Sequence, residues 1–229
     1  MDKKLIIILG PTASGKTALS LELADHLLDK HNLVSEIISA DSRQIYKGMN
    51  IGTAKLSKAE RKRHPHYFID MFAPTKQYSA EAFAQDAQLK IAHIHAKNHL
   101  PIIVGGTGTY VMGLVGGDYL QSSAATSTNY QSLMLVPAYN RPELYRKIEQ
   151  NVDTMFMSGL YNEVKNLIST SHAVPKQVGK TVGYKEFIEY AKQHNKNVFR
   201  LSEADVGKIK HRVKANTKKY AMHQDAGEK

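Results

Sequence analysis

The chain has 229 residues and a net charge of +10, from 31 Lys and Arg against 21 Asp and Glu, and it contains no cysteine. The lack of cysteine excludes disulfide bonds, thiolate zinc sites and a cysteine nucleophile. No run approaches the roughly 18 apolar residues of a membrane span, so we expect a cytoplasmic protein without a leader and without a membrane partner.

A phosphate-binding loop is predicted near the N-terminus. The apolar run over 5–9 predicts a strand, and the pattern G-x-x-x-x-G-K-[ST] follows it directly and opens a helix over about 16–30. Backbone N–H groups of such a loop, together with the helix N-terminus, attract phosphate oxygens. Lys16 adds a positive charge, and the hydroxyl of Thr17 could ligate Mg²⁺. The residues assigned to phosphate or nucleotide binding are Gly10, Pro11, Thr12, Ala13, Ser14, Gly15, Lys16 and Thr17.

Strands and helices alternate over the next hundred residues. We expect strands over 36–40, 67–70 and 101–104, and helices over 79–98 and from the Gly-Gly-Thr-Gly turn at 105–108 to about 114. Such alternation is typical of a parallel sheet with right-handed crossovers, and ligands bind outside the carboxyl ends of its strands. The phosphate loop, Asp41 and the turn at 105–107 should therefore open onto one crevice.

The second half of the chain is predicted to be rich in helix. A small, polar stretch over 116–128 reads as a connector, a strand resumes over 133–136, and helices follow over about 142–157, 160–169, 184–194 and 203–224. The predicted fold class is α/β, a P-loop NTPase-like three-layer parallel sheet with an α-rich C-terminal part. We divide it into a P-loop α/β core (1–115), a connector (116–130), and a returning strand with C-terminal helices that complete the core (131–229).

One segment narrows the function. Residues 39–55, Ser-Ala-Asp-Ser-Arg-Gln-Ile-Tyr-Lys-Gly-Met-Asn-Ile-Gly-Thr-Ala-Lys, resemble the signature of tRNA dimethylallyltransferases, also called tRNA isopentenyltransferases. Blocks at 64–66, 78–80, 104–110, 158–160, 183–186 and 217–221 are similar to further family blocks in the same order. The resemblance implies a prenyltransferase that moves a dimethylallyl group from dimethylallyl diphosphate to the N6 amine of an adenine next to the anticodon in tRNA, with Mg²⁺ as cofactor.

The resemblance also implies roles for individual residues. Asp41 would accept the proton of the adenine amine, and Lys16 and Thr107 would complete the catalytic set. Asp41, Ser42, Arg43, Gln44 and Thr107 would contact the tRNA. Two alternatives stay open. Asp41 could serve solely as a Mg²⁺ ligand, as in many nucleotide hydrolases, and Thr107 could serve solely as a cap of the helix that follows the glycine pair.

Two basic clusters could contact tRNA phosphates. One runs from Lys55 to Arg63 and the other from Lys208 to Lys219. The alternative for each is an ordinary solvated helix face. A target adenine must leave its stack before its amine can react, so a basic rim around the crevice is expected.

The chain departs from the family pattern in three places. The connector stands where family members insert a helical subdomain that helps to clasp tRNA, so the chain resembles a shortened member of the family. In the helix near Pro142, Lys147 and Asn151 occupy family arginine positions with Arg146 one step away, and we assign Arg146 and Lys147 to diphosphate binding. Residues 220–224 stand where the family usually continues with basic residues and a Trp-containing tail.

Other functions remain possible from sequence alone. The same loop could serve a kinase or NTPase that acts on ATP, with Asp41 or Asp70 as the Mg²⁺ carboxylate. A third possibility is a catalytically impaired remnant that binds tRNA or a nucleotide. If the chain is a prenyltransferase, its acceptor could also be a free adenine nucleotide. The sequence does not predict the oligomeric state.

Overall fold

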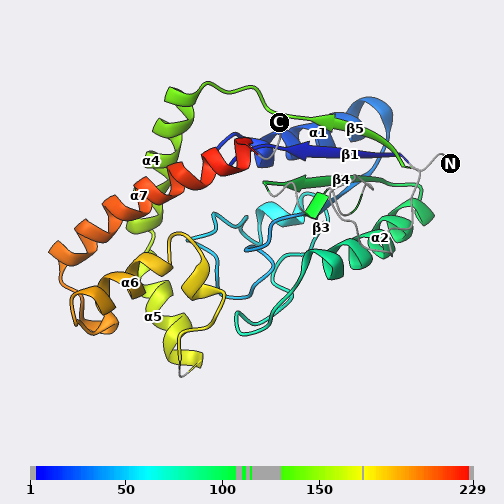
Figure 1. Ribbon diagram of the computed structural model, residues 1–229. Coiled ribbons are helices and arrows are strands. Elements are labelled where there is room, and N and C mark those ends of the chain that lie inside the picture. The colour runs from blue at the N-terminus through cyan, green and yellow to red at the C-terminus, as the bar shows by residue number, and fades with distance from the viewer. Residues whose placement is uncertain (1–3, 107–109, 112–113, 115–129, 172, 227–229) are drawn as a thin grey trace.

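The computed structural model describes residues 4–106, 110–111, 114, 130–171 and 173–226. Its centre is a five-stranded sheet in the order β3-β2-β4-β1-β5 (Figure 1), and every neighbouring pair is parallel. The strands are β1 (Lys4–Leu9), β2 (Ser35–Ser39), β3 (His66–Tyr67), β4 (Leu100–Gly105) and β5 (Gln131–Leu135). The parallel α/β sheet predicted from the alternation of strands and helices is confirmed.

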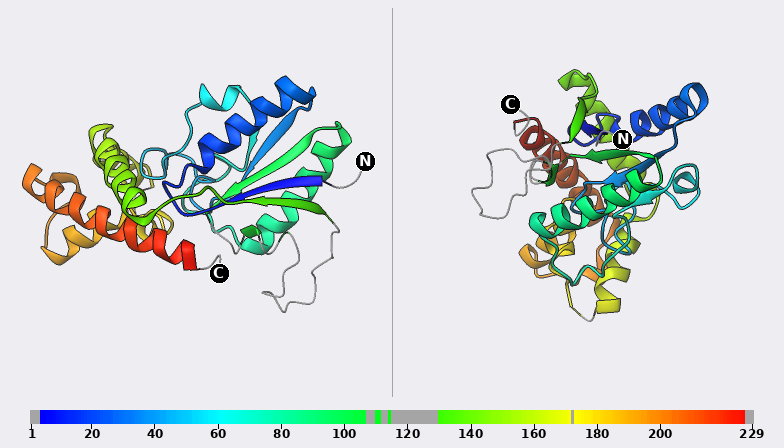
Figure 2. Two further views of the ribbon diagram at one scale, coloured as in Figure 1. Left: turned by 90° about the horizontal axis from the view of Figure 1, so that it is seen from above. Right: turned by 90° about the vertical axis from the view of Figure 1, so that its right-hand side faces the viewer.

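The alternation of side chains along β1 explains the three layers. Leu5, Ile7 and Leu9 face one side and pack in the core that includes α2 (Ala80–Ala96), while Ile6 and Ile8 face the other side and pack against α1 (Lys16–His31). Successive residues of a strand point to opposite faces of a sheet, so a strand that is apolar throughout needs helices on both sides. Figure 2 shows α1 and α2 on opposite faces of the sheet.

Four longer helices follow the last strand. They are α4 (Arg141–Met157), α5 (Leu160–Ser171), α6 (Lys185–Gln193) and α7 (Glu203–Ala226), with short 3₁₀ turns η1 (Glu60–Lys62), η2 (Val178–Lys180) and η3 (Val198–Arg200) elsewhere. One continuous buried cluster contains strand residues such as Ile103 and helix residues such as Phe187 and Val213. The helical part therefore shares a buried core with the sheet.

Helices α4 and α7 pack side by side along a seam of opposite charges. Lys210 and Lys214 of α7 pair with Asp153 of α4, at 2.5 and 2.8 Å, and Lys218 pairs with Glu149. The lysines recur every fourth residue, so they lie on one face of α7. Figure 1 shows α7 crossing α4 and ending near the carboxyl end of β1.

Two predicted elements differ from the structure. The strand expected over 67–70 is only His66–Tyr67, because Phe68 and Asp70 adopt positive φ angles of 62° and 56° that end the extended backbone. The helix expected up to residue 114 lies largely outside the described residues, as does the connector over 116–128. None of the helices in the described ranges is long and apolar enough to cross a membrane.

Candidate active site

The phosphate loop is built at the carboxyl end of β1. Gly10 and Gly15 have φ angles of 147° and 94°, in a region that favours glycine, and Ala13 has a φ of 67°. A non-glycine residue in that region stores strain, which is common at ligand-binding loops. Gly15 is the N-cap of α1 and supplies no side-chain cap, so the amides of the first turn face a ligand. Lys16 folds back over the loop, and its Nζ donates to the carbonyl of Pro11 at 2.7 Å.

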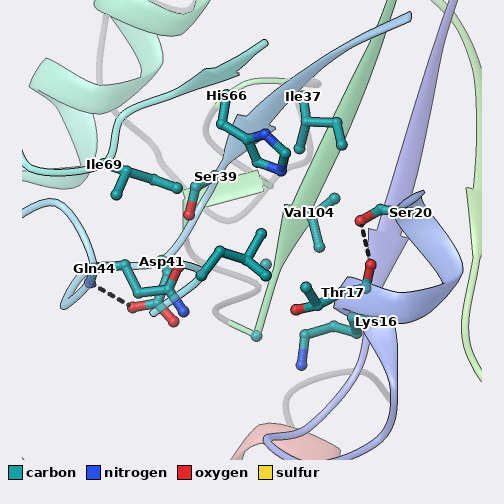
Figure 3. Close-up of a pocket in the computed structure, with 13 residues that line it drawn as sticks. Lys16, Thr17, Ser20, Ile37, Ser39, Asp41, Gln44, His66, Ile69 and Val104 are labelled. Carbon is teal, nitrogen blue, oxygen red and sulfur yellow. Dashed lines mark hydrogen bonds between the residues drawn. The ribbon is translucent and has the colours of Figure 1, made fainter. Parts of the chain in front are cut away.

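A cavity of about 50 Å³ opens beside this loop and is enclosed by the ends of β2, β3 and β4. Its polar side is formed by the phosphate loop and by Asp41, and its other side is mainly apolar (Figure 3). The lining residues are Lys16, Thr17, Ser20, Ile37, Ser39, Asp41, Gln44, Leu56, His66, Ile69, Val104, Gly105 and Gly106.

Asp41 lines this cavity together with Lys16 and Thr17, as the crevice argument expects. Its Oδ1 accepts hydrogen bonds from the backbone N–H groups of Arg43 at 2.7 Å and Gln44 at 3.2 Å. Such a turn fixes the orientation of the carboxylate. The second oxygen, Oδ2, has no hydrogen-bond partner in the described ranges, so it remains available to a ligand.

Of the residues that follow Asp41, some line the cavity and others do not. Gln44 lines the cavity, and its amide donates to the carbonyl of Thr53 at 3.2 Å. Arg43 does not line it, because its guanidinium donates to the side chain of Gln177 at 3.0 Å. Ser42 is half-buried and does not line the cavity either. Thr107 lies outside the described residues, although Gly105 and Gly106 beside it form part of the cavity wall.

The segment after Asp41 is anchored by a carboxylate from α5. Glu163 accepts hydrogen bonds from the backbone N–H groups of Asn50, Ile51 and Gly52 and from the hydroxyl of Tyr184 at 2.7 Å. Burial and the Glu163 carboxylate raise the pKa of Tyr184 far above its ordinary value, so the phenol stays protonated and donates. This contact joins the family-like block at 39–55 to the helical part of the chain.

Asp70, the other carboxylate considered for Mg²⁺, is engaged in two salt bridges. It pairs with Lys55 at 2.6 Å and with Arg61 at 3.0 Å. Burial opposes ionisation of Asp70, but the hydrogen bond and charge of Lys55, with those of Arg61, outweigh it and lower the pKa of the carboxyl. Asp70 does not line the cavity, so it offers a metal nothing at this site.

Two contributions to the site were not assigned from the sequence. His66 lines the cavity from β3 (Figure 3), and its Nδ1–H donates to the carbonyl of His64 at 2.7 Å. Burial lowers the pKa of the His66 imidazole, and its Nε2 has no hydrogen-bond partner among the described residues. Gln224, near the end of α7, accepts a hydrogen bond from the backbone N–H of Thr12 in the phosphate loop and donates one to the carbonyl of Gly106 after β4. His66 belongs to the family-like block at 64–66, which is the signal that could have identified it, whereas residue spacing carries no signal for the contacts of Gln224.

Arg146 and Lys147 lie on an exposed face of α4 and do not line the cavity. Lys147 pairs with Glu143, one turn earlier, at 3.2 Å. Their assignment to diphosphate therefore remains a proposal that the geometry of the cavity does not support.

Comparison with known proteins decides the family. The family model described as IPP transferase matches residues 44–127 and 116–226. A tRNA dimethylallyltransferase of Oenococcus oeni is 34% identical over 233 residues, which cover 98% of this chain and 84% of the relative. The chain belongs to the IPP transferase family. A tRNA dimethylallyltransferase of Streptococcus mutans is 32% identical over 280 aligned positions, covering 98% of this chain and 88% of the relative.

Solved structures of the IPP transferase family agree with this fold. A tRNA Δ(2)-isopentenylpyrophosphate transferase of Staphylococcus epidermidis superposes with a TM-score of 0.82 at 27% identity, covering 97% of this chain and 89% of that one. The full-length tRNA isopentenylpyrophosphate transferase of Bacillus halodurans gives a TM-score of 0.78 at 28% identity, covering 97% and 86%. The two segments of the family match meet within 116–127, the stretch predicted to replace the helical insertion. The division into domains nevertheless stays a prediction.

Proposed function

We propose that this IPP transferase moves a dimethylallyl group from dimethylallyl diphosphate to the N6 amine of an adenine in tRNA. The relatives named above are tRNA dimethylallyltransferases. The observation that carries the proposal is the shared cavity of Asp41 and the phosphate loop, which brings a proton acceptor and an anion cradle to one small space.

The phosphate loop would hold the diphosphate and stabilise it as it leaves. In the reaction, N6 forms a bond to the allylic carbon, the carbon–oxygen bond breaks, and its electron pair departs with the diphosphate. Negative charge would grow on the bridging oxygen, where the loop amides and the Lys16 ammonium would stabilise it. For this role Lys16 must leave the carbonyl of Pro11 and turn to the anion.

The oxygen donors of the cavity fit a magnesium ion held mainly by the substrate. Thr17, Ser39 and Asp41 supply hydroxyl and carboxylate oxygens, and the part of the chain that the structure describes contains no cluster of three or more His, Asp or Glu side chains. Mg²⁺ commonly uses one or two protein ligands together with phosphate oxygens. Bound there through Thr17, it would neutralise charge on the diphosphate.

Asp41 would act on the amine. The lone pair of an adenine amine is delocalised into the ring, so the amine is a weak nucleophile until a base accepts its proton. Asp41 Oδ1 is held by two backbone N–H groups, which leaves Oδ2 to accept that proton as the new bond forms.

The tRNA would approach over the basic surface of the helical part. Lys210, Lys214 and Lys218 are committed to α4, whereas Lys208 and Lys219 are exposed and form no ion pair in the described ranges. In the other cluster, Lys55 and Arg61 pair with Asp70 and Arg63 pairs with Asp25. We therefore expect fewer basic side chains to contact tRNA than the two clusters contain.

One assay tests the proposal. The protein is incubated with labelled dimethylallyl diphosphate and Mg²⁺ and with unmodified tRNA, with AMP, or with ATP alone. We expect label in tRNA and none in AMP. Label in AMP would move the acceptor to a free nucleotide. ATP turnover without transfer, or tRNA binding without either reaction, would contradict the proposal in favour of an NTPase or a remnant that only binds.

A further inference from the structure

Gln224, in the last turn of α7, bridges two loops at the mouth of the cavity. Its Oε1 accepts a hydrogen bond from the backbone N–H of Thr12 at 2.9 Å, and its Nε2 donates to the carbonyl of Gly106 at 2.6 Å. Thr12 belongs to the phosphate loop after β1, and Gly106 follows β4, the neighbouring strand in the sheet. One side chain from the far end of the sequence therefore links two loops that follow directly paired strands.

The end of α7 is held in place on both sides of Gln224. Ala221, one turn earlier, is buried in a cluster with Leu144 and Ile148 of α4, and Ala13 of the phosphate loop packs against this cluster. On the other side, Asp225 accepts a hydrogen bond from the hydroxyl of Tyr139 at 2.6 Å. The contact of Gln224 is therefore part of a built interface between α7 and the phosphate loop.

Gly106 allows the close approach. A Cβ atom at this position would lie 2.2 Å from Nε2 of Gln224, a separation that real Cβ atoms do not show. A side chain at 106 would push the Gln224 amide out of its place. Glycine at 106 and glutamine at 224 therefore form a matched pair.

The chemistry of the bridge requires an amide. An N–H group at Thr12 needs an acceptor, and a carbonyl at Gly106 needs a donor, and the glutamine side chain carries one of each. Glutamate would offer two acceptors and place a negative charge beside the Gly106 carbonyl. Leucine would fill a similar volume and offer neither group.

We propose that Gln224 is a positioning residue of the diphosphate site, which fixes Thr12 relative to Gly106 and transmits the position of α7 to the phosphate loop. This proposal rests on the proposed function for its catalytic consequence. Because α7 is tied to α4 by the lysine–carboxylate seam, a shift of this helix pair would reach the loop through Gln224. Gln224 acts through backbone groups and does not itself meet the reacting atoms.

The test compares Gln224→Leu and Gln224→Glu with His223→Ala, an exposed neighbour on the same turn of α7. The first readout is hydrogen exchange at the Thr12 amide of the full chain, which needs no substrate. We expect exchange at Thr12 to accelerate at least about tenfold in Gln224→Leu, which offers no acceptor, and to stay unchanged in His223→Ala. Gln224→Glu keeps an acceptor for the Thr12 N–H and loses only the donor to Gly106, so its exchange should rise less than that of Gln224→Leu.

The second readout is steady-state transfer to tRNA. We expect kcat to fall about tenfold in the Gln224 variants, with the KM for tRNA within about twofold of wild type, because the loop is displaced while the tRNA surface is intact. The proposal would be overturned if Thr12 in Gln224→Leu exchanged at the wild-type rate. It would also be overturned if the Gln224 variants lost no more kcat than His223→Ala. If the wild-type protein transfers no label, the proposed function fails, and the exchange measurement still decides the role of Gln224.

Gly106→Ala removes the same contact from the other partner. If the bridge is the cause, Gly106→Ala should accelerate exchange at Thr12 as Gln224→Leu does, and the double variant should be no worse than the more severe single variant. Additive losses would show that the two residues act separately and would contradict the proposal.

Discussion

The two ends of β2 carry carboxylates in opposite circumstances. At the amino end, Glu36 is 1% exposed and accepts hydrogen bonds from Tyr67 and His99, each at 2.5 Å, and from Lys97 at 3.1 Å. At the carboxyl end, Asp41 has one oxygen held by two backbone N–H groups and faces a cavity with its other oxygen.

The difference separates structural charge from functional charge. A buried carboxylate with all its partners supplied by the chain stabilises the fold and has nothing left to offer a ligand. A carboxylate that is fixed in direction and has an oxygen without a hydrogen-bond partner in the described ranges is able to contact a ligand in the cavity. Asp70, held by Lys55 and Arg61, belongs with Glu36 in this comparison.

The largest expected effect is at the functional end. Asn at position 41 keeps the acceptor for the N–H groups of Arg43 and Gln44 but cannot take a proton. We expect Asp41→Asn to lower single-turnover transfer roughly 10²- to 10⁴-fold, with binding of inorganic diphosphate by calorimetry little changed.

Asp70→Asn is the matched control for that substitution. It should lower the melting temperature, because it leaves the buried Lys55 ammonium without its counter-charge, while transfer by the folded protein continues. Comparable transfer in Asp41→Asn and wild type would remove Asp41 from the role of base.

The next effect belongs to the structural end. Glu36→Gln removes a charge that three partners satisfy, and we expect a loss of about 3 kcal/mol in the free energy of unfolding. For a chain of this size that corresponds to a fall of roughly 10 °C in melting temperature. Denaturant unfolding measures it, and transfer per folded molecule should not change. A loss of activity without a loss of stability would break the division between the two ends.

The stability that Glu36 and its three partners contribute should depend on pH. Burial of Glu36 works against its ionisation, but the hydrogen bonds from Tyr67, His99 and Lys97 outweigh it and hold its pKa below the usual 4.5. A lowered pKa contributes stability that is present above the unfolded-state pKa and is lost as pH falls through the folded-state pKa. The difference in unfolding free energy between wild type and Glu36→Gln should therefore shrink below about pH 4.5. A difference that is constant from pH 7 to pH 3 would exclude this origin.

The smallest effect is expected at Arg146 and Lys147. Both are exposed, and charges at exposed positions are screened by solvent and salt. We expect the double substitution to alanine to weaken diphosphate binding by about threefold at low salt and less at high salt. A much larger, salt-independent loss would show that α4 contributes directly to the diphosphate site.

Local patterns in the sequence predict much of this molecule. The glycine spacing, the apolar run before it and the helix after it identify the phosphate loop, and the end of a buried strand places Asp41 on the same crevice. Ser79 was expected to begin a helix, and its side chain accepts from the N–H of Ala82 as an N-cap does.

Long-range contacts are where prediction fails. Gln224 meets Thr12 across 212 positions of sequence, and Glu163 meets the loop at 50–52 across more than a hundred. The lysines of α7 were interpreted as a possible surface for nucleic acid, yet three of them pair with acidic side chains of α4. Their spacing in the sequence does not indicate which helix packs against them, so these pairs could not be predicted. Phe68 and Asp70 shortened a predicted strand through positive φ angles that no local pattern indicated.

In the proposed reaction, Asp41 and the phosphate loop meet the two substrates from opposite sides. A crystal structure with an anticodon stem-loop RNA and an unreactive analogue of dimethylallyl diphosphate tests it most directly. We expect the diphosphate in the loop of residues 10–17 and the adenine N6 within about 3 Å of Asp41 Oδ2. An adenine amine bound elsewhere, with Asp41 in contact only with metal, would contradict it.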